Sequence, residues 1–151
     1  MKVVTKHFGE IEVSDDQILN FIGGVPGFEG NKYVLLNSTS EANSPFVWLQ
    51  SLEDTNIALV LVNIYMLYPD YAPDVNDEFL SVLEFESRDD LSVFNVMVIP
   101  EKMEDMTVNL KAPIIINNKN QKAVQVICDN SNYEIKHKVY EDLQKIVEAN
   151  K

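Results

Sequence analysis

Few side chains in this chain of 151 residues have types and spacing that suit catalysis or metal binding. The two histidines, His7 and His137, lie far apart in the sequence, and neither stands near Cys128, the single cysteine. A cysteine nucleophile needs a base beside it, and a thiolate zinc site needs several cysteines, so neither is predicted. Cys128 lies in an apolar segment that we expect to be a strand, and there it should be a small buried side chain. A single cysteine also excludes an intramolecular disulfide.

The densest group of carboxylates is "DVNDEF", from Asp74 to Phe79, which resembles the start of a calcium-binding loop. The sixth position of such a loop requires glycine for a sharp turn, and here it is Phe79. Two pairs of adjacent acids, Glu53–Asp54 and Asp89–Asp90, offer carboxylates for acid–base chemistry. Adjacent side chains usually diverge and loop acids are mostly solvated, so we predict no enzyme, no metal and no cofactor.

The composition predicts one globular domain over residues 1–151, since 46% of the residues are hydrophobic. There are 24 acidic and 12 basic residues, which gives a formal charge of -12. Such a chain repels phosphates and has no basic run to override its total, so direct nucleic-acid binding is not expected. A negative field instead favours encounter with basic partners.

Neither export nor membrane insertion is expected. The longest apolar run, Ile57–Leu67, is interrupted by Asn63 and is shorter than the roughly 20 residues of a spanning helix. The first residues alternate polar and apolar types, unlike the apolar segment of a secretion signal. By elimination we predict a cytoplasmic protein.

Strand-like segments dominate the chain and are bounded by turn residues, a pattern typical of a sandwich or barrel. The segments are KVVTKHF, EIEV, KYVLL, FVWLQS, IALVLVN, LSVFNVMVI, TVNL, PIIIN, AVQVICD and YEIKHK. The first two are joined near Gly9 and read as a hairpin, and the last third resembles an antiparallel meander. We therefore predict an all-β fold, a small antiparallel β-barrel of short strands with a C-terminal α-helix.

The stretch "TVNLKAPIIIN" has the composition of a strand but contains Asn109 and Pro113, which strands usually exclude. Proline cannot donate to a strand ladder and is tolerated at the first residue of a strand. We therefore expect two strands separated at Lys111 and Ala112. Asn109 is expected to be a hydrogen-bonded polar group where the chain turns.

Helical signals are confined to two places. Ser14 and Gln17 have the spacing of a capping box, which favours a single turn within "SDDQILNF". At the C-terminus, apolar residues recur at helical spacing in "VYEDLQKIVEANK". The apolar stripe of this helix can pack on its own barrel or dock to another protein.

Several polar and aromatic residues are candidates for partner recognition. In "GGVPGFEG", Pro26 followed by Gly27 suits a type II turn that would fix the direction of Phe28, either toward a partner or as a plug of the barrel end. Gln50 and Asn109 are amides in apolar strands, so each should bond to a loop or face a groove. Tyr71 suits an interface or a core edge, whereas Trp48 is expected in the core.

Four blocks in order carry a specific resemblance: "GGVPGFEG", "SPFVWLQSLEDTNIALVLVN", "YPDY" and "TVNLKAPIIINNKNQKAVQVI". They resemble the flagellar assembly factor family, FliW, over most of residues 23–127. The resemblance implies a small β-barrel that binds proteins in the cytoplasm and is not an enzyme. It also implies two partners, flagellin and the RNA-binding translational regulator CsrA. When flagellin is abundant, it occupies the factor and the regulator is released. When flagellin is scarce, the free factor binds the regulator and keeps it off the flagellin message.

Positions that match the family pattern supply the candidate partner contacts. They are Pro26, Phe28, Gln50, Asp54, Asp70, Tyr71, Asn109 and Asn117. The chain departs from the pattern at Lys111, a long cation within the usual "NLxAPI", and at Asn63 and Ile64. We expect a monomer when free.

Two alternatives from other classes stay open. One is a small β-barrel enzyme or small-ligand binder with a polar pocket around Gln50 and Asn109. The other is a structural subunit of a larger assembly.

Overall fold

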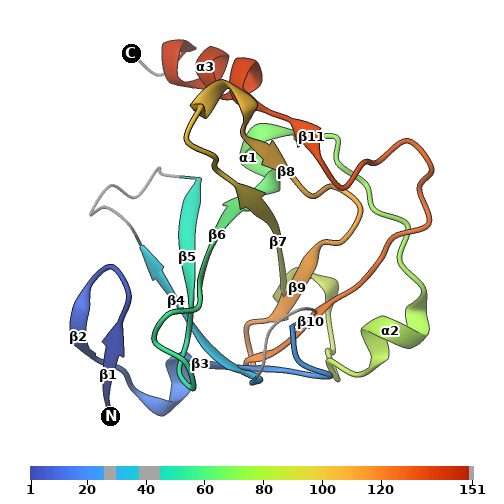
Figure 1. The fold of residues 1–151 in the computed structure, drawn as a ribbon. Helices are drawn as coiled ribbons and strands as arrows, with labels where there is room; N and C mark the ends of the chain where they lie inside the picture. The colour runs from blue at the N-terminus through green and yellow to red at the C-terminus, as the bar shows by residue number, and fades with distance from the viewer. Residues whose placement is uncertain (26–29, 38–44, 150–151) are drawn as a thin grey trace.

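The structure is a computed structural model that describes residues 1–25, 30–37 and 45–149 (Figure 1). Its strands are β1 (Lys2–Thr5), β2 (Gly9–Glu12), β3 (Ile18–Phe21), β4 (Lys32–Asn37), β5 (Phe46–Ser51), β6 (Ala58–Asn63), β7 (Leu91–Val98), β8 (Thr107–Val108), β9 (Ile114–Asn117), β10 (Lys122–Gln125) and β11 (His137–Lys138). Its α-helices are α1 (Ile64–Leu67), α2 (Asp77–Ser81) and α3 (Tyr140–Ala149), and its 3-10 turns are η1 (Asp15–Gln17), η2 (Arg88–Asp90) and η3 (Met103–Asp105).

Seven strands close into a barrel, in the order β7-β6-β5-β4-β3-β10-β9, and β9 returns to pair with β7. Every pair in this ring is antiparallel except β10 with β3, which is parallel. The predicted all-β barrel with a C-terminal helix is therefore confirmed, and one parallel pair closes it. A ring has no open edge within itself, which removes the main site of unwanted strand pairing.

The stretch "TVNLKAPIIIN" forms two strands, as predicted, and these pair with different parts of β7. β8 pairs with the end of β7 at Met97 and Val98, and β9 pairs with the preceding half. Between β8 and β9 the chain leaves β7, and this division of the ladder is called here the fork. Outside the ring, β8 also pairs with β11. The last third is a fork on β7 and not the simple meander that the sequence predicted.

The N-terminal hairpin lies against the outside of the barrel. β1 and β2 pair around Gly9, whose φ of +66° belongs to the left-handed region that glycine adopts freely. Val3 and Val13 pack with Val34 of β4, so the hairpin covers one part of the barrel wall. The predicted hairpin is confirmed, as is the capping box that joins Ser14 and Gln17 in η1.

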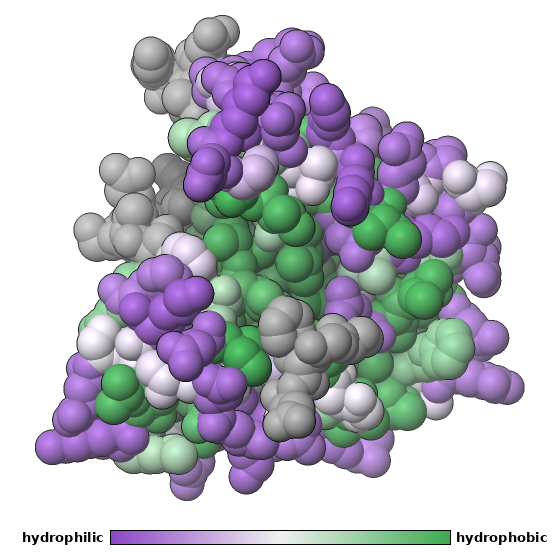
Figure 2. Space-filling view, viewed as in Figure 1, coloured by the Kyte–Doolittle hydropathy of each residue, from purple (hydrophilic) through white to green (hydrophobic). Residues whose placement is uncertain are grey.

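The core has an inner and an outer layer because strand side chains alternate between faces. In β9, Ile114 and Ile116 point into the barrel beside Leu49 and Leu61, whereas Ile115 packs outward under α2. Apolar surface gathers in the centre of the face in Figure 2, and hydrophilic residues surround it.

The C-terminal helix packs on the barrel, which is the first of the two roles that its apolar stripe allowed. Val139 and Leu143 are buried in an outer cluster with Val62 of β6 and Met97 of β7, and α1 completes this cluster. The apolar stripe predicted from the sequence is therefore the face that α3 buries against its own domain.

Several local predictions need correction. The single turn predicted within "SDDQILNF" is present as η1, but the strand β3 that follows it, Ile18–Phe21, was not predicted. Of "YEIKHK", only His137–Lys138 form a strand. Trp48, which was expected in the core, is half-buried and packs on His7 with ring centroids 4.2 Å apart, outside the buried clusters. Cys128 is fully buried, as predicted, but lies beyond β10.

The acidic segment that resembled a calcium loop starts a helix. The Asn76 side chain accepts a hydrogen bond from the backbone N–H of Glu78 at 2.8 Å, which caps α2, and Asp77 and Glu78 occupy its first turn. No helix in the described ranges combines the length and apolar character needed to cross a membrane.

Candidate functional site

The residues of "YPDY" line a groove beside the fork of β7. This groove, called here the tyrosine groove, has a volume of about 400 Å³. Its lining comes from the segment after α1, the residue that follows Asn109, and the segment before and within β11. The lining residues are Tyr68, Pro69, Asp70, Tyr71, Leu110, Asn132, Tyr133 and His137.

The hydroxyls of the three lining tyrosines are all bonded within the protein. Tyr71 donates to the carbonyl of Leu110 at 2.6 Å, and Tyr68 donates to the carboxylate of Asp142 on α3 at 2.5 Å. The Tyr133 hydroxyl accepts from the backbone N–H of Ala72 at 2.9 Å. These bonds fix the orientation of the rings, and the groove therefore offers aromatic surface more than free hydroxyls.

Two of these tyrosines have strongly perturbed acidity. Burial is the main cause that raises the pKa of Tyr68 above its usual range, and the hydrogen bond to Asp142 raises it further. Burial likewise raises the pKa of Tyr71, partly offset by a hydrogen bond from Asn95. Both phenols therefore keep their protons throughout the physiological range, and neither is suited to act as a base.

Asn95 connects the groove to the fork. Its side-chain N–H₂ donates to the carbonyl of Asn109 at 2.8 Å and to the Tyr71 hydroxyl at 3.2 Å. Asn95 is fully buried and lies on β7 between the stretches that pair with β9 and β8. Its amide thus takes the place of strand pairing where the ladder divides.

Asn109 turns the chain within the fork, in agreement with the sequence prediction. Its side-chain oxygen accepts from the backbone N–H groups of Lys111 and Ala112, each at 3.0 Å. Its own N–H donates to the carbonyl of Val96 on β7 at 2.9 Å. Asn109 is half-buried, so its amide is satisfied by the protein while part of the residue remains accessible.

Asp70 is the lining residue that carries a carboxylate. Asp70 is exposed, and in the part of the chain described it forms no ion pair with another residue. The structure therefore brings Asp70, Tyr71 and Asn109 into one neighbourhood, the first two in the groove itself.

Gln50 lies elsewhere, buried at 1% exposure between the barrel and the hairpin. Its oxygen accepts from the backbone N–H of Lys6 at 3.0 Å, and its N–H₂ bonds to the carbonyls of Ser51, Thr55 and Ile57 at 3.0, 3.1 and 3.3 Å. Gln50 thus holds together two loops and a strand end.

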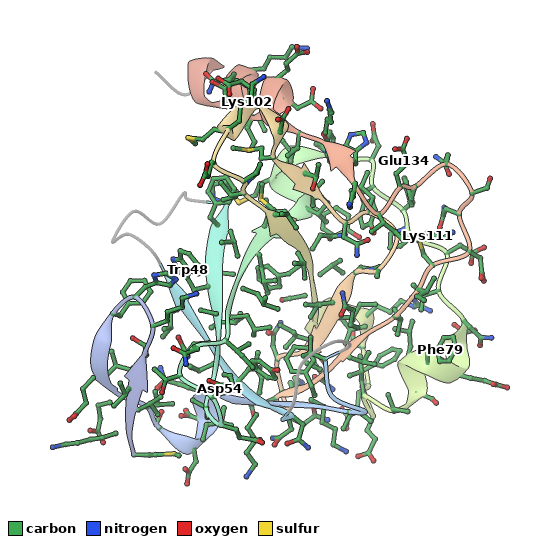
Figure 3. All side chains as sticks on the ribbon, viewed as in Figure 1. Trp48, Asp54, Phe79, Lys102, Lys111 and Glu134 are labelled. Carbon is green, nitrogen blue, oxygen red and sulfur yellow. The ribbon has the colours of Figure 1, made fainter. Side chains whose placement is uncertain are left out.

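Asp54 is exposed in the loop between β5 and β6, near Gln50. Its carboxylate accepts from the backbone N–H of Asn56 at 2.9 Å, and its own N–H donates to the Ser51 hydroxyl. Figure 3 places Asp54 and Trp48 on the hairpin side, away from Lys111 and Glu134. Asp54 therefore belongs to a different surface from the tyrosine groove.

Asn117, at the end of β9, is 2% exposed. It donates to the carbonyl of Leu83 at 3.0 Å and accepts from the N–H of Lys119 at 3.0 Å. This amide anchors the segment after α2 to the barrel. The remaining two candidates, Pro26 and Phe28, lie outside the described residues.

The open alternative of a pocket around Gln50 and Asn109 has no support in the described residues. β6 and β7 separate β5 from β8, which corresponds to roughly 14 Å at about 4.8 Å between neighbouring strands. Both amides are hydrogen-bonded, and neither lines the tyrosine groove. No group of three His, Cys, Asp or Glu side chains in the described ranges is placed to hold a metal ion.

The sequence did not single out Tyr68, Tyr133 or His137 as site residues. His137 bonds through Nε2 to the Tyr68 hydroxyl at 3.1 Å, and the Tyr133 ring lies 4.9 Å from that of Tyr71. These residues are brought together from segments more than 60 positions apart. Of the lining residues, the sequence gave only Asp70 and Tyr71 as candidate contacts, within the block "YPDY".

Comparisons with known proteins identify close relatives over nearly the full length. Residues 2–139 match the family described as FliW protein. The chain is 43% identical over 142 residues to the flagellar assembly factor FliW of Caldicellulosiruptor bescii, covering 93% of this chain and 91% of that protein. It is 40% identical to the protein of the same name from Treponema denticola, covering 95% and 96%.

A solved structure supports the same relationship. The crystal structure of the flagellar assembly factor FliW aligns with a TM-score of 0.82 and 34% sequence identity. The alignment covers 92% of this chain and 96% of that one. The fold of this chain is thus similar over most of its length to that of a solved flagellar assembly factor FliW.

Proposed function

The chain belongs to the FliW protein family, and we propose that it is a flagellar assembly factor that binds flagellin and antagonises the translational regulator CsrA. One observation carries the proposal. Relatives 37–43% identical over nearly the whole chain bear the name flagellar assembly factor FliW. The binding of two partners rests on the resemblance of "GGVPGFEG", "YPDY" and "TVNLKAPIII" to the family pattern.

The proposed activity is a partner switch in the cytoplasm. Flagellin and CsrA occupy the factor in turn, so the free flagellin concentration sets how much CsrA is held off the flagellin message. The formal charge of -12 supports the second partnership, because an RNA-binding regulator carries cationic surface. This exchange of partners needs no cofactor, and the free factor is a monomer.

We place the direct contacts on exposed side chains. Asp70 is exposed and Asn109 is half-buried, whereas Tyr71 between them is buried at 5% exposure and supports this surface, which is our first candidate. Asp54 belongs to a second candidate surface near the hairpin. Gln50 and Asn117 are buried and act by holding the loops that shape these surfaces.

The test is direct binding with purified proteins. We expect a complex with flagellin and a complex with CsrA at micromolar concentrations, and we expect the factor to relieve CsrA repression of a flagellin-leader reporter in a coupled translation reaction. Flagellin added to that reaction should restore repression. Absence of binding to both proteins at micromolar concentration would refute the proposal.

Electrostatic steering gives a second measurement. The association rate with CsrA should fall as salt rises from about 50 to 500 mM, because the Debye length shortens from roughly 14 Å to about 4 Å. Stopped-flow fluorescence measures this rate. An association rate independent of salt would show that the acidic surface serves solubility and not partner recognition.

A further inference from the structure

We propose that the tyrosine groove binds an arginine side chain of the basic partner. This inference rests on the proposed function, because it takes that partner to be an RNA-binding protein with cationic surface. It adds the chemical group that the groove recognises.

The first support is the aromatic lining. Tyr68 and Tyr133 are half-buried, so each keeps part of its surface accessible, and the Tyr71 ring lies 4.9 Å from that of Tyr133. Tyr68 and Tyr71 donate to Asp142 and Leu110, and Tyr133 accepts from the Ala72 N–H, so all three rings are held in place. Fixed aromatic faces attract cations through the ring quadrupole, and little side-chain entropy is lost on binding.

The second support is the charge of the lining. Asp70 contributes a carboxylate that no described residue pairs, and no lysine or arginine lines the groove. Lys111, a long cation that follows Leu110 of the lining, donates from Nζ to the carbonyl of Asn130 at 2.8 Å and is therefore already engaged. A groove with aromatic faces and one unpaired carboxylate is complementary to a cation.

Arginine satisfies both features at once. Its planar guanidinium stacks on an aromatic face and can also bond a carboxylate through two N–H groups, whereas a lysine ammonium is a compact and strongly hydrated charge. A volume of about 400 Å³ accommodates one long side chain with part of the adjoining backbone. A proline-rich segment would use the rings but leave Asp70 without a role.

The first experiment uses three short peptides with the full chain. Acetyl-Gly-Arg-Gly-amide, its citrulline analogue and its lysine analogue are titrated while backbone and tyrosine-ring NMR signals are recorded. We expect the arginine peptide to shift the signals of Asp70, Ala72 and Tyr133, and to bind about tenfold more tightly than the neutral citrulline peptide. Equal binding of arginine and citrulline, or shifts confined to another surface, would overturn the proposal. Lysine binding as tight as arginine would remove the specificity for guanidinium.

The second experiment separates the carboxylate and the ring with matched variants. Asp70→Asn should weaken CsrA binding about two- to fivefold, whereas Glu86→Gln, an equal charge change at an exposed site after α2, should leave it unchanged. Tyr133→Leu and Tyr133→Phe both remove the bond to Ala72, but only the leucine variant removes the ring. We expect weaker binding of about two- to fivefold from Tyr133→Leu relative to Tyr133→Phe.

The two proposals fail in different ways. If CsrA and flagellin bind normally but the matched variants behave alike, the arginine site is wrong and the partner switch stands. If the arginine peptide binds in the groove but CsrA does not bind the chain, the assignment of the partner is wrong. Flagellin binding unaffected by Asp70→Asn is expected, and an equal loss of flagellin binding would refute the assignment of the groove to the basic partner.

Discussion

Replacing Gln50 with methionine should destabilise the protein while leaving the partner affinity of the folded molecules unchanged. Methionine has nearly the same length and volume as glutamine, so no cavity is made. The change removes the acceptor of the Lys6 N–H and the donors to Ser51, Thr55 and Ile57. One N–H₂ has two protons for these three carbonyls, so about three hydrogen bonds are lost in total.

The size of the effect follows from the burial of the site. Each hydrogen bond contributes roughly 0.5–1.5 kcal/mol, and a buried group left unpaired costs about 1–3 kcal/mol. Because the loop can relax and admit water to some of these groups, we expect the free energy of unfolding to fall by about 2–4 kcal/mol. For a domain of this size the melting temperature should then fall by about 5–15 °C.

The assay is urea denaturation with amide exchange, and Gln125→Met is the matched control. Gln125 is half-buried and donates one bond, to the carbonyl of Ala112 at 3.1 Å, so its replacement should cost about 1 kcal/mol or less. In the Gln50 variant the Lys6 amide should exchange faster. If both variants lose the same small amount of stability, Gln50 does not organise the hairpin and loop. If the folded Gln50 variant loses partner affinity instead, the residue acts in binding.

Three further predictions test other polar groups. Tyr33 is fully buried and its hydroxyl has no hydrogen-bond partner among the described residues. Tyr33→Phe should therefore leave the free energy of unfolding unchanged or raise it by about 1 kcal/mol. A decrease of more than about 1 kcal/mol in urea denaturation would show that the hydroxyl does have a partner. Asn109→Ala should cost about 1–2 kcal/mol because two backbone N–H groups lose their acceptor, whereas Asn109→Asp keeps an acceptor oxygen and should lie near the wild type in the same assay. Burial raises the pKa of Tyr68 and Tyr71 in the folded chain, so above a pH of about 10 the unfolded state binds fewer protons than the folded state, and the free energy of unfolding should fall as pH rises. Urea midpoints measured from pH 8 to 11.5 should decline less steeply in Tyr71→Phe than in the wild type. An identical decline in both proteins would contradict this.

The sequence predicted those elements whose cause is local. Apolar runs bounded by turn residues located nearly all of the barrel strands, and Gly9 located the hairpin turn. Pro113 predicted the division of "TVNLKAPIIIN" because proline has no backbone N–H to donate to a neighbouring strand. The helical spacing of Val139 and Leu143 predicted both α3 and the face that it buries.

Features set by distant segments could not be predicted. β3 was hidden because the four residues Ile18–Phe21 follow a helical capping signal, and its strand character depends on β4 and β10 on either side. The parallel closure of β10 on β3 joins segments about 100 residues apart in sequence. The tyrosine groove has the same origin, since Tyr68 and Tyr133 line it from segments 65 positions apart, and Tyr68 is held by Asp142 of α3.

The buried amides explain why a sequence pattern alone mixes partner contacts with structural positions. Asn95, Gln50 and Asn117 all lie where a barrel strand divides or ends, and each donates to a carbonyl outside the regular ladder, on Asn109, Thr55 and Leu83 respectively. A strand ladder satisfies its own backbone, but a fork or a loop crossing leaves carbonyls that water cannot reach. An amide on the adjacent strand supplies the missing donor, and it is then as specific to its position as a contact residue would be. Variants meant to separate the two partners should therefore change exposed side chains such as Asp70 and Asp54, because changes at the buried amides would lower the stability of the fold without distinguishing the partners.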